Sequence, residues 1–220
     1  PIPVPAVAVA QRLKRGWTVF LGSASVFLYR DANLLVLGAT VGDPVAISIY
    51  SLSEKAVKCL QAAARPVNQL FLPKAIAALR GYDRASRGAL VLLRGLLRPQ
   101  LMLVGGGLLL CYLVLLPTLY FFPDWLRANG FDKAVMLVFL MSPAVLLGVA
   151  NFMLGSVGLN HLAASRYLFA TIAGVGLMNL AWCAGLTSAV GVAGGAISFV
   201  LSEAVLLVFV LRAYMRSGAG

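Results

Sequence analysis

The chain has 220 residues, of which 61% are hydrophobic and 11% are charged, and its mean hydropathy is +0.93. Soluble domains contain about 45–50% apolar and about 25% charged residues, so this composition excludes a soluble globular enzyme. Eighteen lysines and arginines stand against seven aspartates and glutamates, which gives a net charge of +11. In a chain this apolar, we expect the positions of these cations to carry the functional information.

Apolar runs separated by charged and Pro- or Gly-rich segments predict an all-α polytopic membrane protein with a bundle of six transmembrane helices. Each run is long enough for a bilayer span, which takes about 20 apolar residues. The expected helices cover residues 17–40, 45–79, 84–119, 133–155, 163–184 and 190–214, within a lobe formed by residues 16–216. Residues 1–15 are expected to be a cytoplasmic N-terminal segment where a fragment starts, and residues 217–220 a C-terminal tail.

Three local patterns refine this prediction. The run over residues 45–79 is too long for one straight span, and Pro66 and Pro73 predict a kink or a projection beyond the bilayer. The aromatic segment around residues 121–125 predicts a loop anchored at the membrane interface. Small residues within the runs predict close helix contacts, namely Gly105, Gly106, Gly107, Gly174 and Gly176.

Cations at the edges of the expected spans predict the orientation. Arg127 and Lys133 lie on one side of the membrane, and eleven cations lie on the other. Because cytoplasmic loops carry an excess of Lys and Arg, both termini are expected in the cytoplasm, which requires an even number of helices. The eleven are Arg12, Lys14, Arg15, Arg80, Arg84, Arg87, Arg94, Arg98, Arg166, Arg212 and Arg216.

Other charges fall inside the expected spans, where a charge is costly unless it faces a cavity or a partner. They are Arg30, Lys55, Lys58, Arg65, Lys74, Asp31, Glu54 and Glu203. In the second run, polar residues recur at intervals of three or four, which predicts one polar face of a helix. This polar face consists of Tyr50, Glu54, Lys58, Gln61, Arg65 and Asn68.

Two interpretations of these charges remain open. Ion pairs between the first two helices, Arg30 with Glu54 or Asp31 with Lys58, would fix helix packing. They would leave Lys55, Arg65 and Lys74 unexplained, which favours a solvated cationic cavity that attracts phosphate-bearing or acidic ligands. In that interpretation the substrate-binding cations are Arg30, Lys55, Lys58 and Arg65, and the polar lining is Tyr50, Gln61 and Asn68.

A second set of cations, Arg80, Arg84, Arg87, Arg94 and Arg98, also keeps helical spacing. It is typical of an interfacial helix on an anionic leaflet, and it also suits a cytoplasmic mouth that captures phosphates. The two interpretations are compatible.

Glu203, between Ser202 and a run of apolar residues, is the carboxylate of the last helix. It is either a group that couples transport to a proton or cation, or a hydrogen-bond partner of Asn151 or Asn179 on a neighbouring helix. The ion-coupling candidates are Asp31, Glu54 and Glu203.

Motifs for other chemistry are missing from the sequence. Cys59, Cys111 and Cys183 lie far apart, without a CxxC pair, and His161 is the sole histidine, so we expect no metal site and no cofactor. The chain has no phosphate-binding loop and no nucleophile with a base in reach, which favours a protein that is not an enzyme. Its basic residues lack the interleaved aromatic residues of a nucleic-acid binder.

Several segments resemble a known family. They are WTVF at 17–20, LY at 28–29, LVLG at 35–38, VAISIY at 45–50 followed by Glu54, Lys55 and Pro73, and GVAGGAISFVLSE at 191–203. Together they resemble the C-terminal half of Wzx-type O-antigen flippases, which belong to the multidrug/oligosaccharidyl-lipid/polysaccharide exporter superfamily with its MATE-like fold.

The resemblance implies two six-helix lobes around a central cavity, with the N-terminal lobe as the missing partner of this chain. It further implies translocation of undecaprenyl-pyrophosphate-linked oligosaccharide across the bacterial inner membrane for O-antigen and lipopolysaccharide biosynthesis. Arg30, Lys58 and Arg65 would face the lumen and meet the lipid carrier. The alternatives are an ion-coupled drug or cation exporter of the same superfamily and a membrane scaffold of polysaccharide assembly.

Overall fold

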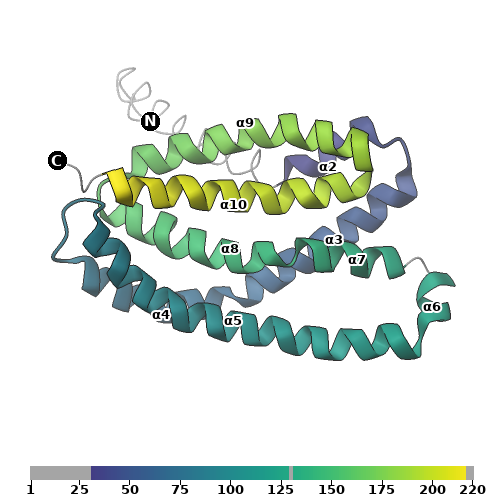
Figure 1. The fold of residues 1–220 in the computed structure, drawn as a ribbon, viewed down its shortest axis with the longest axis horizontal. Coiled ribbons are helices and arrows are strands. Elements are labelled where there is room, and N and C mark those ends of the chain that lie inside the picture. The colour runs from purple at the N-terminus through teal and green to yellow at the C-terminus, as the bar shows by residue number, and fades with distance from the viewer. Residues whose placement is uncertain (1–30, 129–130, 217–220) are drawn as a thin grey trace, which may run out of the picture.

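The computed structural model describes residues 31–128 and 131–216, and all secondary structure in these ranges is helical. The expected all-α class is therefore confirmed. Figure 1 shows an elongated bundle of roughly aligned helices. The helices are α2 (Ala32–Thr40), α3 (Pro44–Ala63), α4 (Arg65–Leu79), α5 (Arg87–Phe121), α6 (Pro123–Ala128), α7 (Phe131–Met141), α8 (Pro143–Asn151), the π-helix η1 (Phe152–Leu159), α9 (Ser165–Val190) and α10 (Val192–Arg216).

Four helical stretches in the described ranges are long and apolar enough to cross a membrane. These are Arg87–Phe121, Phe131–Leu159, Ser165–Val190 and Val192–Arg216. The chain is thus compatible with membrane insertion, whereas a count of six spans stays a prediction. Most of the first expected span, residues 17–40, lies outside the described residues, which contain only α2 from it.

The second expected helix is broken, as its prolines predicted. Asp43 caps α3, where its Oδ1 accepts a hydrogen bond from the Val45 amide at 2.9 Å, and Pro44 occupies the first turn. The chain leaves the helix at Ala64 and resumes it as α4, with Pro66 in the first turn. Pro73 lies inside α4 without ending it.

The fourth expected helix, residues 133–155, is longer and less regular than its sequence indicates. α7 ends at Met141, and Pro143 begins α8, which continues into the π-helix η1. The Tyr214 hydroxyl of α10 donates to the Leu154 carbonyl at 2.7 Å, and Gly158 leaves room for that ring, which a Cβ would overlap. The tyrosine therefore satisfies a carbonyl within the irregular segment.

Two further expectations are corrected. The loop expected around residues 121–125 instead contains the end of α5 and the start of the short helix α6. α5 begins at Arg87, so Arg80 and Arg84 lie in the connection that precedes it and the five arginines do not share one continuous helix. The reason is the segment around Gly81 and Asp83, a turn that separates α4 from α5.

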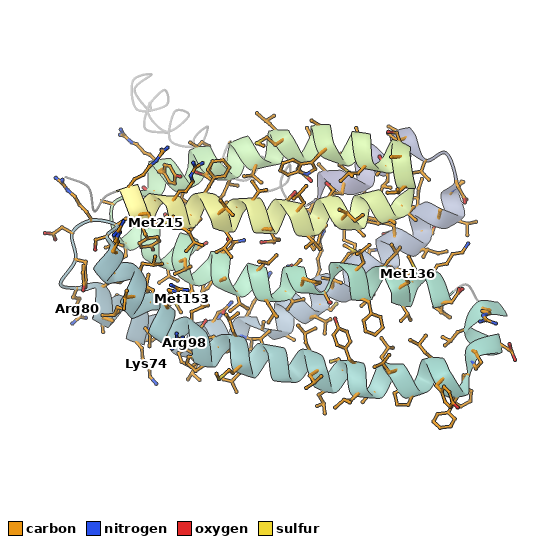
Figure 2. The ribbon with its side chains drawn as sticks, viewed as in Figure 1. Lys74, Arg80, Arg98, Met136, Met153 and Met215 are labelled. Atoms are coloured by element: carbon orange, nitrogen blue, oxygen red, sulfur yellow. The ribbon has the colours of Figure 1, made fainter. Side chains whose placement is uncertain are left out.

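The two ends of the bundle differ in charge. The α4–α5 connection, the start of α9 and the end of α10 lie together on the left of Figure 1, whereas α6 and the α2–α3 turn lie on the right. Figure 2 places Arg80, Arg98 and Met215 at the left end and Met136 towards the right. We call the left end the basic end, because its segments carry Arg80, Arg84, Arg87, Arg94, Arg98, Arg166, Arg212 and Arg216.

Arg127 and Lys133 belong to the segments of the opposite end. The described cations thus separate as the sequence predicted. Arg12, Lys14 and Arg15 lie outside the described residues, and a cytoplasmic location of the basic end stays a prediction.

α9 and α10 pack as an antiparallel pair joined at Gly191, whose φ of +62° is readily available only to glycine. A Cβ at Gly194 would overlap the Leu186 backbone, and a Cβ at Gly195 would lie 2.9 Å from Leu37 Cδ1. Gly194 and Gly195 thus bring helices close together, whereas four of the five expected glycines do not, and the fifth, Gly176, is buried on α9. A Cβ at Gly106, Gly107 or Gly174 would meet no atom within 4 Å, and one at Gly105 only Leu146 Cδ2 at 3.9 Å.

A buried set of polar side chains, which we call the asparagine cluster, joins α2, α9 and α10. Asn179 Oδ1 accepts hydrogen bonds from Ser198 Oγ at 2.6 Å, Ser202 Oγ at 2.7 Å and Trp182 Nε1 at 3.0 Å. Asn179 Nδ2 donates to Asn33 Oδ1 at 2.7 Å. Such bonds hold helices together in an apolar medium.

Candidate substrate cavity

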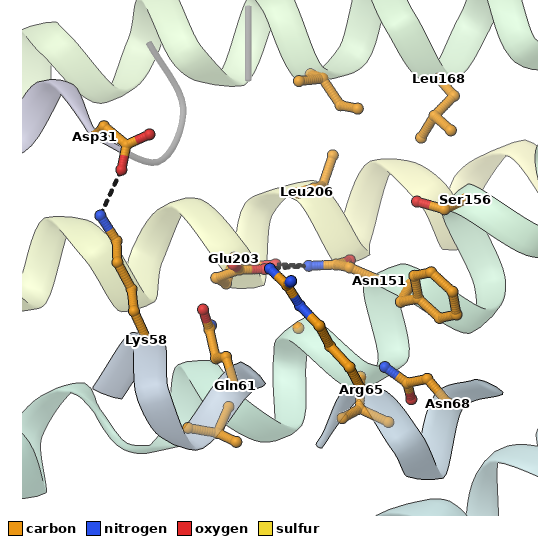
Figure 3. Close-up of a pocket in the computed structure, with 15 residues that line it drawn as sticks. Asp31, Lys58, Gln61, Arg65, Asn68, Asn151, Ser156, Leu168, Glu203 and Leu206 are labelled. Carbon is orange, nitrogen blue, oxygen red and sulfur yellow. Dashed lines mark hydrogen bonds and ion pairs between the residues drawn. The ribbon is translucent and has the colours of Figure 1, made fainter. Parts of the chain in front are cut away.

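A cavity of about 400 Å³ lies between α3 and α4 on one side and α8, η1, α9 and α10 on the other. We call it the polar cavity (Figure 3). Its apolar wall consists of Val145, Val149, Phe152, Leu168, Ile172 and Leu206, with Gly148. Its polar lining consists of Asp31, Lys58, Gln61, Arg65, Asn68, Asn151, Ser156 and Glu203.

Lys58 is held by two carboxylates. Its Nζ pairs with Asp31 Oδ1 and with Glu54 Oε1, the latter at 2.9 Å and one helical turn away. The expected Asp31–Lys58 pair between helices is confirmed, and Glu54 pairs within its own helix. Because two carboxylates share its charge, Lys58 has little attraction left for a ligand.

Arg65 differs from Lys58 in its surroundings. All seven Asp and Glu residues of the chain lie in the described ranges, and Arg65 forms an ion pair with none of them. In Figure 3 its guanidinium extends into the polar cavity towards Glu203 and Asn151. Arg65 is thus the described cavity cation whose charge is available to an anion.

Glu203 is 4% exposed and hydrogen-bonded across helices. Asn151 Nδ2 donates to Glu203 Oε2 at 2.7 Å and to the Glu203 carbonyl at 2.9 Å. The expected contact with a neighbouring helix is confirmed for Asn151, whereas Asn179 belongs to the asparagine cluster. A role for Glu203 in ion coupling stays a prediction.

The cavity amides differ in how far they are satisfied. Gln61 Nε2 donates to the Ala144 carbonyl at 3.1 Å. By contrast, Asn68 Oδ1 and Asn151 Oδ1 are buried and make no hydrogen bond within the described chain. Buried polar atoms normally have a partner, so these two oxygens are acceptors for hydroxyl or amine donors that enter the cavity.

The other sequence candidates lie elsewhere. Tyr50 and Glu54 are buried on α3 but do not line the polar cavity. Lys55 is exposed and does not line it either, which corrects its expected role. It follows Glu54 directly, and one residue is about 100° of rotation around a helix. Arg30 lies outside the described residues.

The remaining cations are outside the cavity as well. Lys74 is exposed, and its Nζ lies 5.6 Å from the centre of the Phe71 ring. The arginines expected as a cytoplasmic mouth are all exposed and none of them lines the polar cavity, which agrees better with an interfacial role. They are Arg80, Arg84, Arg87, Arg94 and Arg98.

The described lining of the polar cavity is balanced in formal charge rather than cationic. It contains the cations Lys58 and Arg65 and the carboxylates Asp31 and Glu203. This corrects the expectation of a cation-dominated cavity for the described part of the lining. The charge is nevertheless unevenly distributed within the cavity. Lys58 and Asp31 neutralise each other, whereas Arg65 forms no ion pair.

Sequence reasoning missed the far wall of the cavity. Asn151, Phe152 and Ser156 line it from α8 and the π-helix. Asn151 within an apolar run was the available signal, because polar side chains in spans face the bundle interior. Within the described ranges no three His, Cys, Asp or Glu residues gather to hold a metal, and the three cysteines form no disulfide.

No protein-family model matches the chain, and neither a curated protein nor a solved structure is significantly similar to it. Its function has therefore to be argued from the polar cavity.

Proposed function

We propose that the chain is one lobe of a transporter that moves undecaprenyl-pyrophosphate-linked oligosaccharide across the bacterial inner membrane during O-antigen or polysaccharide biosynthesis. The observation that carries the proposal is Arg65, which extends into the polar cavity without a carboxylate partner. Arg65 is exposed, and the apolar wall of the cavity beside it strengthens its attraction for an anion. In this role, Arg65 binds the pyrophosphate of the carrier.

The chemistry of the cavity suits such an amphiphile. The planar guanidinium of Arg65 can donate two parallel hydrogen bonds to one phosphate. Asn68 Oδ1 and Asn151 Oδ1 provide acceptors for sugar hydroxyls. Phe152 and Leu206 contribute apolar surface beside these groups, as ligand sites commonly do.

Irregular backbone next to the cavity supports transport rather than a static scaffold. The α3–α4 break at Ala64 precedes Arg65 directly, and η1 carries Phe152 and Ser156. Within membranes, interrupted helices are tolerated where they are buried in protein or line a cavity, and transporters place their substrate sites there. In the proposed mechanism, a second lobe faces this side and rocking of the lobes exposes the cavity alternately.

A second candidate is the ion-coupled export of cationic compounds. It is favoured by one observation, the carboxylates Asp31 and Glu203 in the same lining. It predicts that Glu203→Gln raises drug susceptibility while surface polysaccharide stays normal. The main proposal predicts loss of surface polysaccharide from Arg65→Ala, without a change in drug susceptibility.

The deciding experiment is done on the full gene, in a polysaccharide-producing strain that depends on it. Arg65→Ala should lower surface polysaccharide about tenfold and accumulate lipid-linked repeat units, because the charge-assisted bonds to phosphate are lost. Lys55→Ala is the matched control, since Lys55 is an exposed cation that does not line the cavity. Normal export by Arg65→Ala, or equal loss from both variants, would overturn the proposal.

A further inference from the structure

A second hollow, of about 300 Å³, lies between α9 and α10 near the basic end. We call it the arginine groove. It shares no lining residue with the polar cavity. Ala170, Gly174 and Met178 line it from α9, and Phe209, Arg212 and Arg216 from α10.

The shape of the groove follows from small side chains on one helix face. Ala170, Gly174 and Met178 are spaced by four residues and therefore form one ridge of α9. A Cβ at Gly174 would meet no atom within 4 Å, so the missing side chain leaves open space at the middle of this ridge. Tyr167 Oη donates to the Phe209 carbonyl at 2.9 Å and joins the two helices beside the groove.

The charge of the groove is concentrated at one end. Arg212 and Arg216 are one turn apart on α10, and both are exposed. Neither forms an ion pair with any of the seven Asp and Glu residues, all of which lie in the described ranges. The rest of the lining is apolar except for Thr171 and for the Tyr167 hydroxyl, which is bonded to the Phe209 carbonyl. The groove thus offers two unpaired cations followed by a mostly apolar floor.

We infer that the arginine groove binds one anionic phospholipid of the leaflet at the basic end. Its phosphate lies between Arg212 and Arg216, and one acyl chain lies over Ala170 and Gly174 towards Met178. Basic pockets between membrane helices bind anionic headgroups, because guanidinium groups pair with phosphate and the chain stays in apolar surroundings. From Ala170 to Met178 the ridge is about 12 Å long, enough for most of an extended acyl chain.

This inference does not depend on the proposed transport function. It rests on charge complementarity with an anionic headgroup, whereas an apolar helix in the same groove would be indifferent to headgroup charge. A dependence on headgroup charge therefore separates the lipid from a protein occupant.

The test is a lipid titration of the purified, delipidated chain, followed by native mass spectrometry. Phosphatidylglycerol and phosphatidylcholine with identical acyl chains are the probes. The unmodified chain should bind the first lipid about tenfold more tightly or better. Arg212→Ala with Arg216→Ala should weaken phosphatidylglycerol binding about 25-fold, because each cation near the surface contributes about fivefold.

Two matched controls exclude general effects of charge and bulk. Arg94→Ala with Arg98→Ala removes two exposed arginines of the same spacing at the basic end, away from the groove, and should change binding little. Gly174→Leu should fill the groove and abolish the preference for phosphatidylglycerol. Gly185→Leu, on the same helix and also with open space at its Cβ, should not.

Equal binding of the two lipids by the unmodified chain would overturn the inference. So would full phosphatidylglycerol binding by Gly174→Leu, or an equal loss from the Arg94 and Arg98 substitutions.

Discussion

Two groups of polar side chains in the described bundle differ in how far their hydrogen-bonding capacity is used. In the asparagine cluster, Asn179 makes four side-chain hydrogen bonds to residues of α2, α9 and α10. In the polar cavity, Asn68 Oδ1 and Asn151 Oδ1 have no partner in the described chain. Arg65, at the same cavity, has no carboxylate partner.

The difference shows that polarity within an apolar bundle is not in itself evidence of a site. A group whose donors and acceptors are matched holds helices together and offers nothing to a ligand. A group with unmatched capacity costs stability, unless a ligand or solvent supplies the partners. The asparagine cluster should therefore govern stability, and the polar cavity should govern the proposed transport.

The largest effect is expected from Asn179→Leu. It leaves Asn33, Ser198 and Ser202 without their shared partner in the interior, so the free energy of unfolding should fall by about 3 kcal/mol. The measurement is unfolding of the purified chain in mixed detergent micelles. Ser188→Ala, on the exposed side of the same helix, is the control and should stay within about 0.5 kcal/mol. Unchanged stability of Asn179→Leu would show that the cluster is not what joins α9 and α10.

The second-largest effect is expected at Gly194, where α10 approaches α9. This close approach allows the hydrogen bonds of the asparagine cluster to form. Gly194→Ala places a methyl group against the Leu186 backbone and should lower the free energy of unfolding by about 2 kcal/mol. Gly185→Ala, where a Cβ meets no atom within 4 Å, should be neutral or slightly stabilising. The same unfolding measurement applies, and equal stability of the two variants would contradict the close packing.

A smaller loss is expected at the edge of the polar cavity. Lys58→Met removes the ammonium that Asp31 and Glu54 share and should lower the free energy of unfolding by about 1–2 kcal/mol, since Lys58 and Asp31 are only partly buried. Lys55→Met removes a neighbouring exposed cation and serves as the control. If the two variants unfold alike, the ion pairs do not contribute to stability.

The smallest effect on stability is expected for the unmatched amide. Asn68→Leu removes an acceptor that has no partner in the described chain, so the free energy of unfolding should change by less than about 0.5 kcal/mol or rise slightly. Transport should nevertheless fall, because the cavity loses a hydrogen-bond acceptor. A fall of more than about 1.5 kcal/mol in the free energy of unfolding would show that Asn68 stabilises the fold, as the asparagine cluster does.

Much of the helical framework could be predicted from the sequence. Long apolar runs and prolines indicate where helices start and break, and the break beside Pro66 occurs as expected. The ion pair between Asp31 and Lys58 could also be predicted, because adjacent antiparallel helices bring those two positions together. The separation of cations between the two ends followed from the same pattern.

The site itself was predicted less well, because spacing identifies a helix face but not what that face meets. Lys55 differs from Lys58 by three residues, yet only Lys58 lines the cavity. The π-helix η1 has no signature in an apolar run, since every residue of such a run can be buried. Gly174 and Gly194 look alike in the sequence, although one opens a groove and the other allows close contact.

The asparagine cluster also has a consequence for the order in which the chain is made. Asn33 and its partner Asn179 are 146 residues apart, and Ser198 and Ser202 follow Asn179. At synthesis rates of about 5–20 residues per second, Asn33 waits about 7 to 30 s for its partner. During that interval the side-chain amide of Asn33 lacks the partner that it has in the folded bundle. The last described helix, α10, thus completes the bonding of Asn179, the residue that binds Asn33 of the first described helix.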